Sequence, residues 1–269
     1  MRRSCLRVLS AVGFALLCVS STTWAQVAPP LGTAAAFGAL GNSGIVGSAG
    51  LGTAVNGEVG SSPTPSVTNF PPSRTVPPFT VHFANDGVVQ QAHTDAIAAY
   101  VALFNQGGAA INANLSTNGI LGPGVYAVGA GDLPNGTTMT LNDPTGTGIF
   151  IFNVASTLTM NTNSVVNGTA NPCNIYWRVG SSATLNGVTM LGTVIANASI
   201  TLGPGNLVGR ALAGTGASGA VTMPVGGNTI GGCSVAGAGV PTLPEWAVVA
   251  LAGFLALAGL VTLGKRQAL

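Results

Sequence analysis

Residues 148–223 repeat one short phrase, in which an outward threonine precedes an inward leucine or methionine in an expected strand. The copies are Ser156-Thr157-Leu158-Thr159-Met160, Ala183-Thr184-Leu185, Ile200-Thr201-Leu202 and Val221-Thr222-Met223, with a forerunner in Thr138-Met139-Thr140-Leu141. Their threonines are about 17 to 25 residues apart, the range of periods in which one supersecondary unit stacks on the next as a solenoid. The repeat therefore predicts stacked β coils with a regular flat surface.

The strands of this stretch are of two kinds. Residues 148–154 and 174–179 are apolar or aromatic on both sides, which is typical of strands with both faces covered. The threonine strands alternate instead, which predicts one buried face and one face in water. The candidate contact residues on the wet face are Thr140, Thr157, Thr159, Thr184, Thr201 and Thr222.

One helix is predicted for residues 85–106. Asn85 or Asp86 can cap its start, and Gly107-Gly108 ends it. About 20 residues at 1.5 Å each span roughly 30 Å, the height of about six stacked strands. The helix is therefore expected to run along the solenoid and to cover the doubly apolar strands. Its predicted buried stripe is Val89, Ala92, Ala96, Tyr100, Leu103 and Phe104.

Composition favours a turn-rich β protein. Charged residues are 5%, hydrophobic residues are 47%, and there are 40 glycines and 16 prolines. The formal charge of +2 comes from the chain ends, since residues 26–240 hold three arginines, no lysine and five acids. Nucleic acid and other anionic polymers are excluded as partners, because phosphate binding needs clustered Lys and Arg.

Residues 1–25 have the pattern of a secretory signal, cleaved before Gln26. The alternative is a membrane anchor, although the apolar run of residues 8–19 is shorter than the roughly 20 residues that a span needs. Cys173 and Cys233 would remain after cleavage. In an oxidising compartment they are expected to pair, which is worth about 4 kcal/mol by loop entropy. No cofactor is expected and no metal, because His82 and His93 lack a close ligand spacing with the cysteines.

Residues 31–233 resemble the bacterial ice-binding-protein-like family, whose domain is also known as a domain of unknown function. The matching phrases include Leu31-Gly32-Thr33-Ala34-Ala35-Ala36-Phe37, Val67-Thr68-Asn69-Phe70-Pro71-Pro72, Pro123-Gly124-Val125-Tyr126 and Gly209-Arg210-Ala211-Leu212-Ala213. The resemblance implies a mainly β fold, a discontinuous right-handed β-solenoid (β-helix) of triangular section with one long α-helix alongside. It also implies that one flat face binds ice.

The resemblance offers a second set of contact residues. Thr53-Ala54-Val55-Asn56 is similar to the Thr-Ala/Gly-x-Thr/Asn phrase of ice faces in this family, and Thr215-Gly216-Ala217-Ser218 matches it more loosely. The alternative ice-binding residues are therefore Thr53, Asn56, Thr215 and Ser218. A plainer interpretation of all the threonines stays open, since outward threonines are common on any exposed β surface.

The C-terminal residues 241–269, after a linker at 234–240, are similar to the IPTL-type sorting signal of Gram-negative bacteria. The motif residues are Pro241, Thr242, Leu243, Glu245 and Trp246. The apolar run 246–263 followed by Lys265-Arg266 predicts a membrane span with a cytoplasmic positive end. A permanent anchor is the alternative to a processed signal. Export and sorting machinery and the membrane are the implied partners.

The sequence thus predicts an exported protein, secreted or at the cell surface, that adsorbs to ice and inhibits recrystallisation or attaches the cell to ice. The alternative is a structural or adhesive surface module without ice activity. An enzyme is not expected, because the acids Glu58, Asp86, Asp95, Asp132 and Asp143 are scattered along the sequence.

Overall fold

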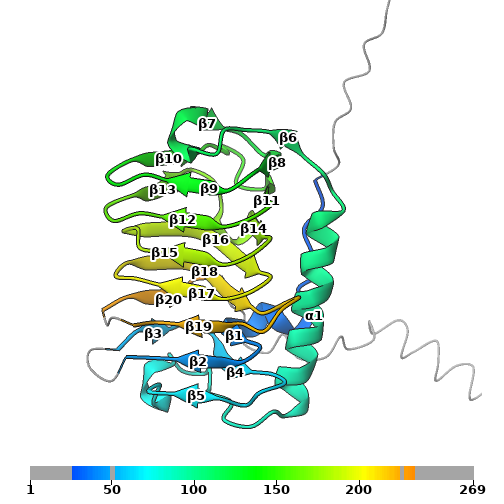
Figure 1. Ribbon diagram of the computed structural model, residues 1–269, viewed down its shortest axis with the longest axis vertical. Coiled ribbons are helices and arrows are strands. Elements are labelled where there is room, and N and C mark those ends of the chain that lie inside the picture. Colours follow the sequence, from blue (N-terminus) through cyan, green and yellow to red (C-terminus); the bar gives the residue numbers. More distant parts are fainter. Residues whose placement is uncertain (1–25, 49–51, 225–226, 234–269) are drawn as a thin grey trace, which may run out of the picture.

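The computed structural model describes residues 26–48, 52–224 and 227–233 (Figure 1). Short parallel strands stack as the coils of a β-helix, and one α-helix lies alongside them. The predicted signal (1–25), linker (234–240), sorting motif and membrane span (246–263) lie outside the described residues. Within the described ranges, no helix is long and apolar enough to cross a bilayer.

The first sheet has seven strands and one uncovered outer surface. In four of these strands one half-buried residue lies between two buried residues. In stacking order the strands are β5 (Val67–Thr68), β2 (Gly44–Val46), β19 (Ala220–Thr222), β17 (Ile200–Leu202), β15 (Ala183–Leu185), β12 (Leu158–Met160) and β9 (Gly131–Leu133).

The second sheet has 13 strands in two limbs joined by the long strands β16 (Thr189–Ala196) and β18 (Asn206–Ala213). The start of β16 pairs with β13 (Val165–Gly168), and its end pairs with β14 (Ile175–Val179). The helix-side limb adds β4 (Glu58–Ser61), β1 (Phe37–Gly41), β14 (Ile175–Val179), β11 (Phe150–Val154), β8 (Gly124–Val128) and β6 (Ala109–Ala110). The open limb adds β3 (Ala54–Val55), β20 (Thr229–Gly231), β13 (Val165–Gly168), β10 (Thr138–Leu141) and β7 (Ile120–Leu121).

Two glycines lie in register where the limbs meet. Gly192 pairs with Gly209. Gly192 has φ +109°, and a Cβ on it would come within 2.7 Å of the carbonyl oxygen of Ile175. Only glycine fits this conformation and spacing without strain, so the pair allows one strand to continue from one limb into the other.

The stack does not follow chain order. Ala39 of β1 pairs with Ala211 of β18, and Ile45 of β2 pairs with Val221 of β19. The third pairing of this kind joins β3 to β20. The first coil of the sequence therefore lies on the last, and the helix carries the chain along the stack to the far end, where β6 begins the remaining coils (Figure 1). This confirms the discontinuous β-helix-like arrangement.

The helix α1 (Gly87–Phe104) begins two residues later than predicted. Asp86 caps it, because its carboxylate accepts hydrogen bonds from the backbone N–H groups of Val88 and Val89, both at 3.0 Å. The predicted cover of the doubly apolar strands is confirmed. The helix buries Val89, Ala92, Ala96, Ala99 and Leu103 against a sheet surface that includes Leu40, Val125, Ile151, Tyr176, Ile195 and Leu212.

The last turn of α1 differs from the prediction of a buried Tyr100 and Phe104. Phe104 is 59% exposed, and Tyr100 is only half-buried. The guanidinium of Arg178, which projects outward from β14, lies 4.4 Å from the ring centre of Tyr100 and 4.7 Å from that of Phe104. Both rings therefore cover a cation rather than join the apolar stripe.

Between the sheets lies a closely packed interior. The rings of Phe152 and Trp177 stack with centres 4.0 Å apart, and the Trp177 indole N–H donates to the carbonyl of Leu191 at 2.9 Å. The inward residues of the threonine strands are buried as predicted, namely Leu141, Leu158, Leu185, Leu202 and Met223.

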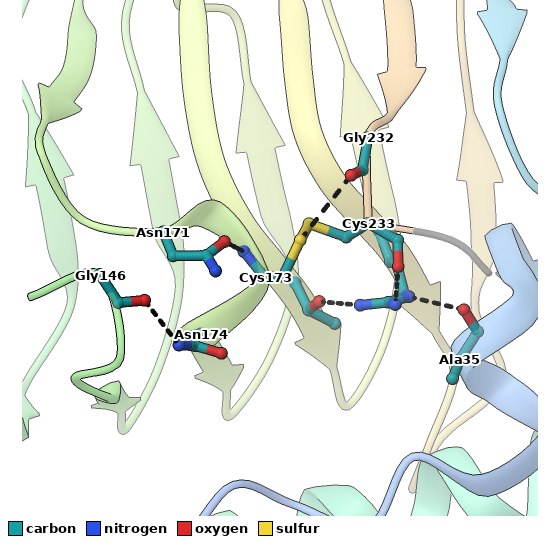
Figure 2. Close-up of a disulfide and its surroundings, with 9 residues drawn as sticks. Ala35, Gly146, Asn171, Cys173, Asn174, Gly232 and Cys233 are labelled. Carbon is teal, nitrogen blue, oxygen red and sulfur yellow. Dashed lines mark hydrogen bonds between the residues drawn. A yellow bond between two sulfur atoms is a disulfide. The ribbon is translucent and has the colours of Figure 1, made fainter.

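A disulfide joins Cys173, in the 3₁₀ turn η4 (Pro172–Asn174), to Cys233 (Figure 2). Next to it, Arg210 is 5% exposed and donates to the carbonyls of Ala35 and Cys233 and to the hydroxyl of Thr193. Burial lowers the pKa of Arg210 from its ordinary value. These bonds and the disulfide hold the end of the described chain against the stack. The remaining 3₁₀ turns are η1 (Gly32–Ala36), η2 (Pro72–Arg74) and η3 (Leu115–Asn118).

Candidate functional site

Four of the predicted threonines form a single row on the seven-stranded sheet. Thr159 pairs in register with Thr184, Thr184 with Thr201, and Thr201 with Thr222. Each is half-buried, and each is preceded and followed by a buried residue in its strand region. Since neighbouring strands are about 4.8 Å apart, the four side chains repeat at that spacing along the stack. We call this row the threonine ladder.

The hydroxyls of the threonine ladder face solvent. In the described part of the chain, none of the four side chains makes a hydrogen bond to another protein group. Threonine is β-branched, so its χ1 angle is stiff and its methyl and hydroxyl groups keep their positions. The ladder therefore presents methyl and hydroxyl groups that lose little entropy on binding.

The residues beside the ladder are small or neutral. Two positions before the threonines lie Thr157, Ser182, Ser199 and Ala220, and two positions after them lie Asn161, Asn186, Gly203 and Pro224. Thr157 is exposed, as predicted for a contact residue, and it belongs to this flanking row rather than to the ladder. No side chain in the two flanks is charged or aromatic. The surface around the ladder is therefore uncharged and free of large rings.

The ladder register continues at both ends, into residues that the sequence did not reveal. Beyond Thr222 it runs through Val46 to Thr68. Beyond Thr159 it reaches Asp132, which forms a bridge to Asn114. Val46 and Thr68 come from the N-terminal coils, so only the out-of-order stacking brings them into the row.

Thr140 lies apart from the ladder. It is on β10 in the open limb, where it pairs with Asn167 and donates a hydrogen bond to the Asn167 amide oxygen at 3.1 Å. The structure therefore divides the six predicted threonines into four ladder residues, one flanking residue and one residue on another surface.

The alternative residues do not form one surface. Thr53 is fully buried and donates to the side-chain oxygen of Asn228, and Thr215 is 5% exposed and donates to the carbonyl of Ala196 at 3.1 Å. Asn56 and Ser218 are exposed, but Asn56 follows β3 and Ser218 lies in the turn between β18 and β19. Two of these four hydroxyl or amide groups are thus used in internal hydrogen bonds.

The open limb is a second uncovered surface without charged residues in its strands. Its outward row is less uniform, because the register joins Thr138, Val165, Thr189, Asn206, Thr229 and Ala54. Some of its polar groups also bind one another, as in the hydrogen bond from Thr229 to the Asn206 amide oxygen at 2.7 Å. The ladder is therefore the more regular of the two surfaces.

Two acids that are distant in the sequence meet at His82, although we expected them to be scattered. The imidazole Nδ1 lies 2.8 Å from a carboxylate oxygen of Asp86, and Nε2 lies 3.3 Å from one of Glu58. The spacing of His82 and Asp86 (i, i+4) is the one sequence signal for this cluster. Across the described ranges, no three His, Cys, Asp or Glu side chains are placed to hold a metal. The cluster ties the helix start to β4.

The second histidine has a packing role. His93 Nε2 lies 3.1 Å from the carbonyl oxygen of Gly214, and burial lowers the pKa of the imidazole despite that contact.

Comparison with known proteins gives matches that include these coils. An ice-binding-like family model matches residues 39–230. An ice-binding protein of Nostoc sp. (strain HG1) is 36% identical over 205 residues, which is 72% of this chain and 71% of that protein. The matched range extends from β1 to β20 and so includes all four ladder threonines.

Solved structures show the same fold. The crystal structure of an ice-binding protein from the Antarctic ascomycete Antarctomyces psychrotrophicus superposes with a TM-score of 0.64 at 29% identity, over 78% of this chain and 100% of that one. That of an ice binding protein from an Antarctic biological consortium gives a TM-score of 0.61 at 34% identity, over 78% of this chain and 93% of that one.

Proposed function

Because the chain belongs to the ice-binding-like family, we propose that it binds ice and that the threonine ladder is the centre of the adsorbing face. The observation that carries the choice of face is the unbroken register from Thr159 through Thr184 and Thr201 to Thr222. A contact row of identical side chains at one spacing is what a crystalline ligand requires.

The proposed mechanism is a match between two lattices. Along the stack the ladder repeats about every 4.8 Å, and alternate residues along a strand repeat about every 6.7 Å. Ice is itself a lattice of oxygen atoms, so many weak contacts can form together. The stiff threonines lose little entropy in these contacts. The free hydroxyls can hold ordered water, and the methyl groups occupy the spaces between.

The surroundings of the ladder support this choice. The eight flanking residues two positions before and two positions after the ladder threonines are neutral, so they carry no strongly hydrated ion. The opposite side of the stack is covered by α1 and is unavailable for a flat ligand. The open limb is uncovered, but its side chains are mixed and partly bonded to each other.

We further propose that the coils are right-handed and triangular in section, and that residues 31–233 are the ice-binding domain. Parallel strands joined by crossovers in one sheet are almost always right-handed, and the three strand rows supply three sides. Export is supported by the Cys173–Cys233 disulfide, because disulfides persist in oxidising compartments. Secretion or cell-surface display from a Gram-negative bacterium, with sorting or membrane attachment through residues 241–269, stays part of the proposal.

In this role the protein is not an enzyme. Its effect is to inhibit the recrystallisation of ice or to attach the cell to ice. The family of the chain supports this, and the four ladder threonines and their flanking residues carry no charge. The test is whether the purified chain shapes growing ice crystals and suppresses recrystallisation at micromolar concentration.

The face is tested by paired substitutions. Thr184→Tyr with Thr201→Tyr places two bulky rings on the ladder, and ice activity should be lost. Thr189→Tyr with Thr229→Tyr places the same rings on the open limb as a matched control, and activity should remain. The reverse pattern in folded variants would move the site to the open limb. An unmodified chain that leaves ice growth unchanged but binds cells or polysaccharide would favour an adhesive surface module.

A further inference from the structure

We propose that the charge of Asp132 limits the ice-binding face at one end, because it interrupts a row of otherwise uncharged residues. The inference rests on the proposed function of the ladder. It concerns a position that is set by the fold, because Asp132 of β9 pairs in register with Thr159 of β12. Asp132 therefore occupies the place in its coil that a threonine occupies in each of the next four coils.

Asp132 is chemically unlike the rest of its sheet. The strands of the seven-stranded sheet contain no other charged residue. Its carboxylate accepts one hydrogen bond, from the side-chain amide of Asn161 at 2.8 Å, and that amide also donates to the carbonyl of Leu133 at 3.2 Å. Among the described residues the ion pairs involve only His82 with Glu58 and Asp86, so no cation neutralises Asp132.

An uncompensated carboxylate disfavours adsorption to ice at this position. An ionised group holds its hydration water strongly, and removing that water costs far more than for a hydroxyl or a methyl group. The water around an ion is also oriented toward the charge, whereas the ladder threonines can share water with a lattice. Contact with ice is therefore expected to follow the row of paired residues that begins at Thr68 and ends at Thr159. It is expected to stop before Asp132, the next position in register.

The other end of the row provides the contrast. There the register passes from Thr222 to Val46 and then to Thr68. Valine has the branched shape of threonine and lacks only the hydroxyl, so Val46 keeps the surface flat and neutral. The two ends of the ladder thus differ in kind, because one is interrupted by a missing hydroxyl and the other by a charge.

The hydrogen bond to Asn161 gives Asp132 a structural role that must be separated from its charge. Asp132→Asn keeps an amide oxygen as the acceptor and removes the charge. Asp132→Thr removes the charge, replaces the carboxylate with a hydroxyl and extends the row from four consecutive threonines to five. Val46→Thr adds a hydroxyl at the neutral end and serves as the matched control for row length.

The experiment compares the thermal hysteresis of the full chain and these three variants at equal concentration, after equal thermal unfolding midpoints have shown that all are folded. Asp132→Asn should widen the gap between the melting and growth temperatures of ice, and Asp132→Thr should widen it further, because the consecutive threonine row then has five members instead of four. Val46→Thr should change the gap less than Asp132→Thr does, because valine carries no charge to remove.

A charge placed inside the ladder gives an independent measurement. Thr184→Asp should lose more activity than Thr184→Asn, since the two side chains have nearly the same shape. An active wild-type chain with unchanged hysteresis in both Asp132 variants would overturn the inference, and so would equal losses for Thr184→Asp and Thr184→Asn. An inactive wild-type chain would instead refute the proposed function itself.

Discussion

Thr184 and Thr201 lie directly opposite each other on β15 and β17, and neither hydroxyl has a hydrogen-bond partner in the described part of the chain. This pair is at the middle of the threonine ladder. Each of the two threonines offers a methyl group and a hydroxyl to a ligand. The hydroxyls make no hydrogen bond within the sheet, so the methyl and the hydroxyl can be altered one at a time.

The first prediction concerns the methyl and hydroxyl groups of Thr201. Thr201→Val keeps the branched shape and loses the hydroxyl, whereas Thr201→Ala also loses a methyl group and rotameric stiffness. We expect Thr201→Ala to reduce thermal hysteresis more than Thr201→Val does. Thr189→Val on the open limb is the control and should leave the thermal hysteresis unchanged. Equal activity of Thr201→Ala and wild type would exclude Thr201 from the contact.

The second prediction concerns the disulfide. Cys173 and Cys233 are separated by 60 residues, and a bond that closes such a loop is worth about 4 kcal/mol by chain entropy. Cys173→Ser with Cys233→Ser should therefore lower the free energy of unfolding by roughly this amount, as measured by urea denaturation. Reducing agent should destabilise the wild type similarly and leave the double variant unaffected. A double variant as stable as the oxidised wild type would contradict the prediction.

The third prediction is a pH dependence at the start of α1. Burial raises the pKa of Asp86, but hydrogen bonds from His82, Val88 and Val89 and the charge of His82 outweigh it, and the net shift is downward from 3.8. A lowered folded-state pKa stabilises the protein above the unfolded value, and this stability is lost as the pH falls below about 3.8.

Asp86→Asn tests that dependence, because asparagine also caps helices well. The variant should unfold at nearly the same temperature as wild type at low pH and at a lower temperature at neutral pH. Circular dichroism at a series of pH values measures both. Parallel losses of stability in the two proteins on acidification would assign the acid sensitivity to other groups.

The fourth prediction concerns the interior under the helix-side limb. Trp177 is fully buried and stacks on Phe152, so Trp177→Ala should cost about 3 to 5 kcal/mol of unfolding free energy. Val188→Ala is a control on an exposed side chain and should cost less than about 0.5 kcal/mol. Chemical denaturation of both variants measures the difference. A loss at Trp177 no larger than that at Val188 would mean that the interior is not packed as described.

The sequence predicted the parts of the fold that repeat locally. The Thr-Leu phrases identified the strands of Thr159, Thr184, Thr201 and Thr222, because a period of two residues fixes which side chain points outward. The cap at Asp86 and the glycines after residue 106 likewise located the helix to within two residues. Such signals depend on neighbours in the chain and are visible without the structure.

The remaining features depend on pairing between distant segments. Thr140 has the same local phrase as the ladder threonines, yet its strand belongs to the open limb. The positions of the turns in each coil, and not the local phrase, determine which sheet a strand joins. Val46 and Asp132 carry no phrase at all and enter the row through register alone. The burial of Thr53 follows from its bond to Asn228, which lies at the other end of the sequence.

The out-of-order stacking has a consequence for how the protein is made. The coil of β1, β2 and β3 leaves the ribosome early, but its partners β18, β19 and β20 are synthesised last. Contacts so distant in sequence form slowly, because a long loop must close first. Until it closes, the row that contains Val46 and Thr222 does not exist as one surface. An incomplete chain therefore has an unfinished edge, and the full row from Thr159 to Val46 and Thr68 forms only when synthesis of the whole domain is complete.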